Sequence, residues 1–316
     1  MEINKRFELI KRNTVEIIGE DILIKLLKGN KKPSIYCGYE TSGDIHLGHL
    51  VSMIKLLDFQ KAGMKVKVLF ADWHTYLNSK GDWKFINEQL KKWEKSFKSF
   101  GIKADFVKGT KIERNNDYID DVFTLALDIT LNRGLRSMQE VARDAKNAKI
   151  SQVIYPLMQI TDFKYLKIDG ALGGIEQRKI HMLAHESLKK IHYKIPFFIH
   201  HELIPSLRGL GKGKMSSSIK ESMISINDSE KEIKSKLNKT YCSEGETKDN
   251  PVLSIIKLII FPFFERVKVN RDKKFGGDVL YENYSDLEND FKSKKLHPVD
   301  LKNAVGDNLV KLFKKF

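Results

Sequence analysis

The sequence predicts an α/β protein: a doubly wound parallel sheet at residues 1–222, followed by a smaller all-helical domain at 223–316. Three observations support this fold. Short apolar segments at 34–39, 66–70 and 104–107 alternate with stretches of helical periodicity, which is the pattern of strand–helix–strand units. A turn containing glycine joins the first apolar segment to the helix after it. Beyond residue 222 only helical patterns occur.

The remaining elements follow from their local patterns. Residues 7–28 predict one or two amphipathic helices, and 196–201 a late strand. Helical patterns at 118–131 and 135–145 form an insertion at about 110–150, and the small and basic residues at about 205–220 predict a mobile loop. In the last third, serines that begin the patterns SEKE and SDLE predict helix starts with capping boxes at Ser229 and Ser285.

Composition sets the class of protein. The 316 residues carry a formal net charge of +15, which suits a polyanionic partner, although a lysine-rich solvated surface explains it equally well. The two cysteines, Cys37 and Cys242, indicate neither a zinc site nor a disulfide framework, so a reducing compartment is expected. No uncharged run approaches the roughly 20 residues of a membrane span, and the N-terminus lacks a signal-peptide core. We therefore expect a cytoplasmic protein.

Two short motifs far apart in the chain fit opposite walls of one nucleotide site. His46 and His49 begin the helix after the glycine turn and face the same way, and a helix N-terminus suits phosphates. Gly48 leaves room for a base near the backbone. Far downstream, the segment 208–218 (RGLGKGKMSSS) offers a lysine that can follow developing phosphate charge. Taken singly, the first motif is more often a pair of surface histidines and the second a flexible basic loop.

These motifs resemble the two nucleotide signatures of class I aminoacyl-tRNA synthetases. The segments 153–162 (VIYPLMQITD) and 173–182 (GGIEQRKIHM) resemble the amino-acid pocket of tyrosyl-tRNA synthetases, most closely those of archaea and eukaryotes. Residues 275–278 and 296–305 resemble the anticodon-binding end of that branch. The resemblance implies a Rossmann-like catalytic domain and a tyrosine–tRNA ligase. Such an enzyme activates L-tyrosine with ATP to tyrosyl-adenylate, releases pyrophosphate, and transfers tyrosine to the 3′ end of tRNA(Tyr).

The resemblance implies a role for each motif residue at the nucleotide. His46 and His49 would hydrogen-bond phosphate oxygens in the transition state, and Gly48 would contact ATP. In the loop, Lys214 would neutralise the leaving pyrophosphate, and the hydroxyl groups of Ser216 and Ser217 would donate hydrogen bonds. Mg²⁺ is expected to travel with ATP, and no structural metal is expected. Two departures from the family pattern, Thr41 and residues 219–221, bear on turn and loop dynamics.

The resemblance also implies an amino-acid pocket. Tyr36 and Asp162 would bind the substrate phenol, which phenylalanine lacks. The substrate ammonium would meet neutral oxygen acceptors from Tyr155, Gln159 and Gln177. From the residues alone, Tyr36 is more often an ordinary strand aromatic, and Asp162 is equally a helix-surface carboxylate. Glu40 would orient the substrate ammonium or the loop, and Asp72 and His74 stay open between lining the pocket and forming a structural turn.

Positions for tRNA come from the same resemblance. The acceptor end would meet Arg136, Arg178 and Lys179, and the anticodon would meet Phe275, His297 and Asp300. Solvated charge and a helix start at His297 are the plain alternatives. The relatives act as homodimers with the 110–150 insertion near the two-fold axis, so a homodimer is expected, without DNA or membrane partners.

Two other functions fit part of this pattern. A tryptophan-specific relative shares the fold and signatures, but Tyr36 with Asp162 favours a phenol over an indole. A non-catalytic tRNA-binding paralogue would not need the intact His46, His49 and Lys214.

Overall fold

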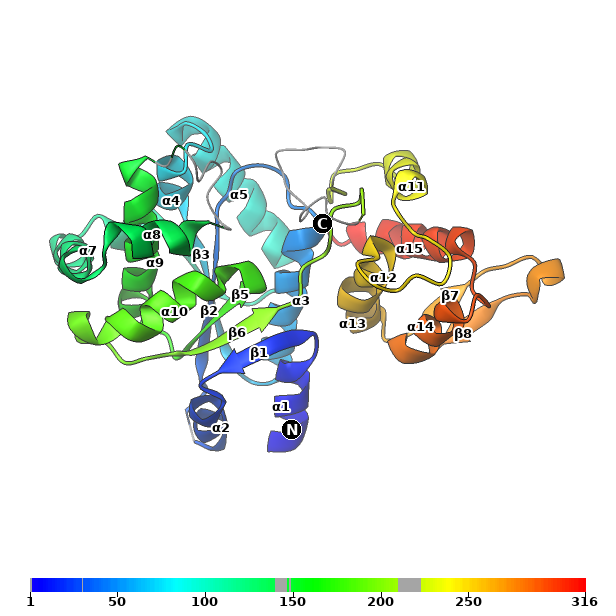
Figure 1. Cartoon of the computed structure of the whole chain (residues 1–316), viewed down its shortest axis with the longest axis horizontal. Coiled ribbons are helices and arrows are strands. Elements are labelled where there is room, and N and C mark those ends of the chain that lie inside the picture. The colour runs from blue at the N-terminus through cyan, green and yellow to red at the C-terminus, as the bar shows by residue number, and fades with distance from the viewer. Residues whose placement is uncertain (1, 30, 140–146, 148, 210–222) are drawn as a thin grey trace. The chain divides into compact units, whose positions relative to one another are not determined.

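The computed structural model describes residues 2–29, 31–139, 147, 149–209 and 223–316 (Figure 1). The chain divides into two compact units, one of Met1–Ser42 with Lys55–Glu202, the other of Gly43–Ile54 with Leu203–Phe316. The domain boundary predicted near residue 222 falls at the edge of a segment outside the described residues, so it stays a prediction.

A six-stranded sheet forms the centre of the first unit. Its order is β1-β6-β5-β2-β3-β4, with bounds Thr14–Ile18 (β1), Ser34–Tyr39 (β2), Lys65–Phe70 (β3), Asp105–Lys108 (β4), Gly170–Gly174 (β5) and Phe197–His201 (β6). Strands β2 to β6 are parallel, which confirms the predicted doubly wound sheet. Strand β1, however, pairs antiparallel with β6. The helix predicted for residues 7–28 is therefore wrong at 14–18, because this edge strand forms only by pairing with β6, which lies far away in the chain.

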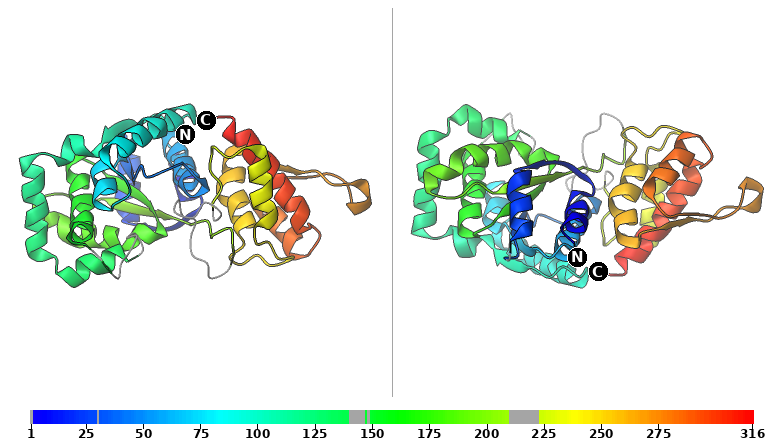
Figure 2. Two further views of the ribbon diagram at one scale, coloured as in Figure 1. Left: turned by 90° about the horizontal axis from the view of Figure 1, so that it is seen from above. Right: turned by 90° about the horizontal axis from the view of Figure 1, so that it is seen from below.

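Helices cover both faces of this sheet. They are α1 (Ile3–Lys11), α2 (Glu20–Lys28), α4 (Asp72–Leu77), α5 (Trp83–Ser99), α6 (Gly109–Glu113), α7 (Asn116–Asp128), α8 (Leu131–Met138), α9 (Ile150–Tyr165) and α10 (Arg178–Ser187), with 3₁₀ turns η1 (Ile175–Gln177) and η2 (Leu188–Ile191). Helices α7 to α10 lie on one face, and α1 and α5 on the other (Figures 1 and 2). The strand order reverses between β2 and β5, so the carboxyl ends of these two strands form the switch point where such sheets bind ligands.

The second unit is mainly helical. Helix α3 (Leu47–Lys61) begins in it, and α11 (Glu230–Lys239), α12 (Pro251–Ile255), the π turn η4 (Ile256–Ile260), α13 (Phe261–Phe264), α14 (Tyr284–Lys292) and α15 (Pro298–Phe313) follow. Ser229 and Glu232 form the predicted capping box of α11. The predicted cap at Ser285 is wrong: Asn283 caps α14 by accepting a hydrogen bond from the Asp286 amide. The helix therefore begins two residues earlier than predicted, because the Asn283 side chain is a good N-cap and reaches the Asp286 amide.

The expectation of helices alone is wrong in one place. Strands β7 (Val267–Val269) and β8 (Val279–Tyr281) pair antiparallel as a two-stranded hairpin. Its connection contains the turn η5 (Lys273–Phe275) and then Gly276 and Gly277, with φ of 99° and 74°. Both values lie in the left-handed region that glycine adopts without strain. Strands of three residues are too short for an alternation to stand out in the sequence.

Two further observations concern the expected class of protein. Within the described residues, no helix is long and apolar enough to cross a membrane. Cys37 and Cys242 are both free, the first buried and the second partly buried.

Candidate active site

The two residues predicted to meet a phenol share one buried interior at the end of β2. The Tyr36 side chain is 3% exposed and folds back over Gly38, where an added Cβ would lie 2.3 Å from Tyr36 Oη. Asp162, on α9, is fully buried and accepts a hydrogen bond of 2.8 Å from Tyr118 Oη. Burial raises the pKa of Tyr36 well above its usual value, and the nearby Asp162 adds to this rise. The outward-facing arrangement that would exclude a phenol site is therefore absent for these two residues.

The residues predicted for the ammonium group lie together in the same unit. Gln159 Nε2, on α9, donates to Gln177 Oε1 at 3.3 Å. Tyr155 lies one helical turn before Gln159 and is nearly buried, with its ring edge-on to His74 at a centroid distance of 4.6 Å. Gly173, at the end of β5, makes room for Gln177, because a Cβ there would come within 2.7 Å of it. Oxygen acceptors thus gather near the switch point of the sheet.

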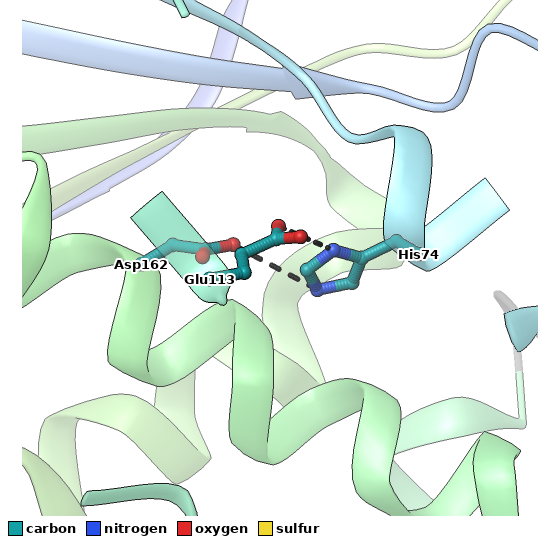
Figure 3. A group of neighbouring side chains, drawn as sticks. All are labelled: His74, Glu113 and Asp162. Atoms are coloured by element: carbon teal, nitrogen blue, oxygen red, sulfur yellow. Dashed lines mark ion pairs between the residues drawn. The ribbon is translucent and has the colours of Figure 1, made fainter. Parts of the chain in front are cut away.

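His74 lies between two buried carboxylates (Figure 3). Its Nδ1 is 3.1 Å from Glu113 Oε1 and its Nε2 is 3.7 Å from Asp162 Oδ2. Burial lowers the pKa of His74, but Glu113 and then Asp162 outweigh burial and raise the pKa to about 9, so the ring is an imidazolium at neutral pH. The ring turns a different nitrogen to each carboxylate. This is the arrangement of an ion pair, whereas one metal ion would need all three donors to point at a single centre.

Tyr118 and Glu113 were missed by the sequence analysis, and His74 was left open. Tyr118 lies in the first turn of α7, Glu113 ends α6 and His74 belongs to α4. No local pattern marks any of them, because each meets Asp162 or its neighbours only through tertiary packing. The only signal in the sequence was that Glu113 and Tyr118 lie in the predicted helical insertion, at positions that could face the protein interior.

In the second unit, the histidine motif has a defined hydrogen-bonding state. The rings of His46 and His49 stack at a centroid distance of 3.8 Å. Gly48 N donates to His46 Nδ1 at 3.1 Å, and His46 N donates to His49 Nδ1 at 3.2 Å. Burial lowers the pKa of His46 to about 4, so this ring is neutral at pH 7. Because the Gly48 amide donates to Nδ1 of the neutral His46 ring, the proton of that ring lies on Nε2, where it can be donated to an anion.

Besides the predicted contact with ATP, the conformation of the His46 side chain also requires a glycine at position 48. A Cβ at this position would lie 2.9 Å from His46 Cε1. A side chain here would therefore push the His46 ring out of its hydrogen bond with the Gly48 amide. The glycine is needed for the histidine geometry itself.

The segment after the predicted lysine loop is anchored to the histidine motif. Leu47 N donates to Ile224 O at 3.1 Å, and Ile226 N donates to Ile45 O at 3.0 Å, on either side of the bridge between His46 and Ser225. Lys214, Ser216 and Ser217 lie outside the described residues. The chain therefore leaves that loop directly beside His46.

The residues predicted for the tRNA acceptor end lie near one another in the fold. Arg136, on α8, is exposed. Arg178 Nε donates to Glu16 Oε1 at 2.6 Å, and Lys179 Nζ donates to Gln139 Oε1 at 3.2 Å. A tRNA phosphate would have to replace the Glu16 carboxylate at Arg178.

The residues predicted for the anticodon belong to the hairpin connection and to the start of α15. Phe275 is 63% exposed, with Lys274 Nζ 4.9 Å from its ring centre. His297 is the N-cap of α15 and accepts from Val299 N, so the predicted helix start is present, and Asp300 lies in the first turn. Arg271 ties the hairpin to the segment before α15 by donating to Lys295 O. An exposed aromatic and a half-buried carboxylate are thus presented by connected segments.

Comparison with known proteins defines the class. The family model described as tRNA synthetases class I (W and Y) matches residues 28–314. The chain belongs to this family. It is 46% identical over 312 residues to the tyrosine–tRNA ligase of Archaeoglobus fulgidus, covering 98% of this chain and 95% of that protein. It is also 46% identical over 308 residues to the tyrosine–tRNA ligase of Methanocaldococcus jannaschii, covering 97% and 96%.

A solved structure agrees with these relatives. The crystal structure of tyrosyl-tRNA synthetase from Archaeoglobus fulgidus complexed with L-tyrosine matches with a TM-score of 0.96 at 44% identity, covering 99% of this chain and 98% of that one. The resemblance inferred from the motifs, and the Rossmann-like class I fold, are confirmed.

Proposed function

We propose that the buried site around Tyr36 and Asp162 binds L-tyrosine, and that the histidine motif and the lysine loop bind the phosphates of ATP. The activity is that of a tyrosine–tRNA ligase, a class I aminoacyl-tRNA synthetase. The tyrosine carboxylate attacks the α-phosphate of ATP and pyrophosphate leaves. A hydroxyl of the tRNA 3′-terminal ribose then takes the tyrosyl group from the adenylate.

One observation carries the assignment of the tyrosine site. Asp162 is buried with one oxygen, Oδ2, that has no hydrogen-bond partner among the described residues. A buried acceptor without a partner is costly, and a phenolic O–H would satisfy it. Tyr36 would complete the pairing with its own hydroxyl, and Tyr155, Gln159 and Gln177 would accept the substrate ammonium.

At the phosphates, the chain supplies donors and no covalent intermediate. Neutral His46 would donate from Nε2 to phosphate oxygens as charge develops, and His49 would contact the phosphates beside it. Lys214 with Ser216 and Ser217 would bind the leaving pyrophosphate. Mg²⁺ would enter with ATP and share its phosphate charge. Such catalysis depends on positioning and electrostatics.

ATP–pyrophosphate exchange with tyrosine, tryptophan and phenylalanine, measured separately, tests this function. Fastest exchange with tyrosine is expected. Faster exchange with tryptophan would favour the tryptophan-specific relative. Binding of tRNA without any adenylate would favour a non-catalytic paralogue.

For tRNA, we propose that Arg136, Arg178 and Lys179 contact the acceptor end, and that Phe275, His297 and Asp300 contact the anticodon. Phe275 is suited to stack on an unpaired base, and Asp300 to accept from a base N–H edge. A cytoplasmic location, where tRNA is charged, is part of this proposal.

Asp300→Ala is expected to slow tRNA charging by about tenfold or more, the usual cost of one lost base contact. Pyrophosphate exchange, which needs no tRNA, should not change. Asp307→Ala on the same helix, at a site with 45% side-chain exposure, is the matched control. Equal losses in charging and exchange for Asp300→Ala would contradict the anticodon role.

We also propose a homodimer formed through the insertion. Large apolar side chains are exposed on α7 and at the starts of α8 and α9: Phe123, Leu127, Leu131 and Ile150, with Leu127 92% exposed. Phe123 and Leu127 are four residues apart on α7 and share a face. A second copy would bury this apolar surface, which lies in the segment that the resemblance puts at the two-fold axis.

Leu127→Asp is expected to weaken the dimer by roughly a hundredfold or more, because a two-fold interface loses two buried leucines at about 1.5–3 kcal/mol each. Sedimentation equilibrium would show a monomer at concentrations where the unchanged chain is a dimer. Val15→Asp, on an exposed apolar side chain of β1, should leave the mass unchanged. If Leu127→Asp is as dimeric as Val15→Asp, the dimer does not form through this surface.

A further inference from the structure

Glu113 is a buried carboxylate that the catalytic assignment above leaves unused. It ends α6 and has no exposed surface. Its Oε1 lies 3.1 Å from His74 Nδ1, while His74 Nε2 stays 3.7 Å from Asp162 Oδ2 (Figure 3). Both contacts are ion pairs without hydrogen-bond geometry, and the one with Glu113 is the shorter of the two. The imidazolium therefore lies closer to Glu113 than to Asp162.

The backbone around Glu113 is arranged to hold the carboxylate in this place. Asp72 accepts hydrogen bonds of 2.8 Å from both Thr110 N and Thr110 Oγ1, which fixes the start of α6. A Cβ on Gly109 would lie 2.6 Å from Glu113 Oε1. Glycine at 109 thus lets the Glu113 carboxylate fold back over the first turn of its own helix toward His74.

The two oxygens of Asp162 have different surroundings. Oδ1 accepts from Tyr118 Oη, and Oδ2 has no hydrogen-bond partner among the described residues. Burial raises the pKa of Asp162; the His74 cation acts against that rise, and the Glu113 carboxylate adds to it. The other titratable groups that act on this cluster are three neutral tyrosines and one acid with a lysine partner: Tyr36, Tyr118, Tyr155, and Glu40 with Lys80. Asp72, paired with Lys108, lies near Glu113 beside Gly109.

We propose that Glu113 is a positioning residue for tyrosine selection: it holds the His74 imidazolium on its own carboxylate and so leaves Asp162 Oδ2 open to accept the phenolic hydrogen of the substrate. This rests on the proposed role of Asp162. Without the Glu113 charge, the imidazolium faces a single carboxylate and closes onto Oδ2. Tyrosine must then displace it, whereas phenylalanine leaves the new pair intact. Glu113 therefore sets part of the penalty that excludes phenylalanine.

Glu113→Gln tests the proposal by pyrophosphate exchange. The KM for tyrosine should rise about tenfold with little change in kcat, as for one hydrogen bond to a charged group, and the preference for tyrosine over phenylalanine should fall by a similar factor. The KM for ATP should not change. Asp58→Asn, which removes the buried partner of Arg12, controls for general loss of a buried carboxylate and should keep the preference. An unchanged preference in a folded Glu113→Gln variant would overturn the proposal.

Two measurements keep the outcomes separate. Asp162→Asn should itself lower the preference; if it does not, the phenol site is wrong, and if it does while Glu113→Gln does not, only the role of Glu113 is wrong. Should Glu113→Gln fail to fold, ¹⁵N spectra of the unchanged chain with bound tyrosine decide, with His74 identified by its loss in His74→Gln. We expect an imidazolium at pH 7, and a neutral His74 there would overturn the proposal.

Discussion

Replacing Asp162 by alanine is expected to lower the preference for tyrosine over phenylalanine, measured as the ratio of kcat/KM values, by about 100-fold. A hydrogen bond to a charged acceptor is worth roughly 1.5–3 kcal/mol, and phenylalanine leaves that acceptor unpaired in the unchanged site. Tyrosyl-tRNA synthetases are the standard example of this discrimination, at roughly 10⁵-fold. The alanine removes the acceptor and with it the penalty on phenylalanine. The KM for ATP should change far less.

Alanine also leaves His74 and Tyr118 facing a void, so Asp162→Asn is the better matched variant. Asparagine keeps the shape and one acceptor oxygen but removes the charge. We expect the preference of Asp162→Asn for tyrosine over phenylalanine to lie between the preference of the unchanged chain and that of Asp162→Ala. Thermal melts and active-site titration separate a loss of folded protein from a loss of selectivity. If folded Asp162 variants keep the full preference, the phenol is recognised elsewhere.

Replacing His46 by alanine is expected to slow adenylate formation by roughly 10²–10³, the usual cost of removing one donor to a developing oxyanion. The KM values for tyrosine and ATP should change little, because the contact is made chiefly in the transition state. His185→Ala, on an exposed histidine of α10, should leave the rate unchanged. Single-turnover formation of the adenylate is the measurement.

The hydrogen bonds of His46 allow a sharper test. Since Gly48 N occupies Nδ1, only Nε2 carries a proton to donate. The glutamine amide nitrogen takes the place of Nε2 and the asparagine amide nitrogen that of Nδ1. His46→Gln should therefore keep more activity than His46→Asn. Because burial holds the pKa of His46 near 4, the rate should have no acid limb from this residue between about pH 6 and 8. Equal activity of the two amide variants would contradict the Nε2 assignment.

How far the fold could be predicted depended on how local each element is. The parallel strands stood out because each is a buried apolar run bounded by helices. Strand β1 did not, because residues 14–18 become a strand only by pairing with β6, where Thr14 meets His201. The hairpin β7–β8 was missed for the same reason: its three-residue strands carry almost no pattern. Local periodicity predicts elements that are long enough to bury a face of their own.

The nucleotide motifs could be picked out from the sequence because their residue types and spacing are themselves the signal, and the residues proposed for the pocket followed from the family resemblance. The backbone pairing of residues 45–47 with 224–226, which sets the latter segment beside His46, could not. Nor could the arrangement around Asp162 be found, since its partners come from α4, α6 and α7.

By itself the sequence determined the class of sheet, the position of the two nucleotide motifs and the residue types available to meet tyrosine. Only the tertiary structure decided which charges share a buried space. His74, Glu113 and Asp162 are separated by dozens of residues, yet the positive charge of the His74 imidazolium lies within 3.7 Å of both carboxylates. In a buried site the energy of a charge depends on which groups lie within a few ångströms and on how little water reaches them. Neither the neighbouring groups nor the access of water can be predicted from the local spacing of residues in the sequence.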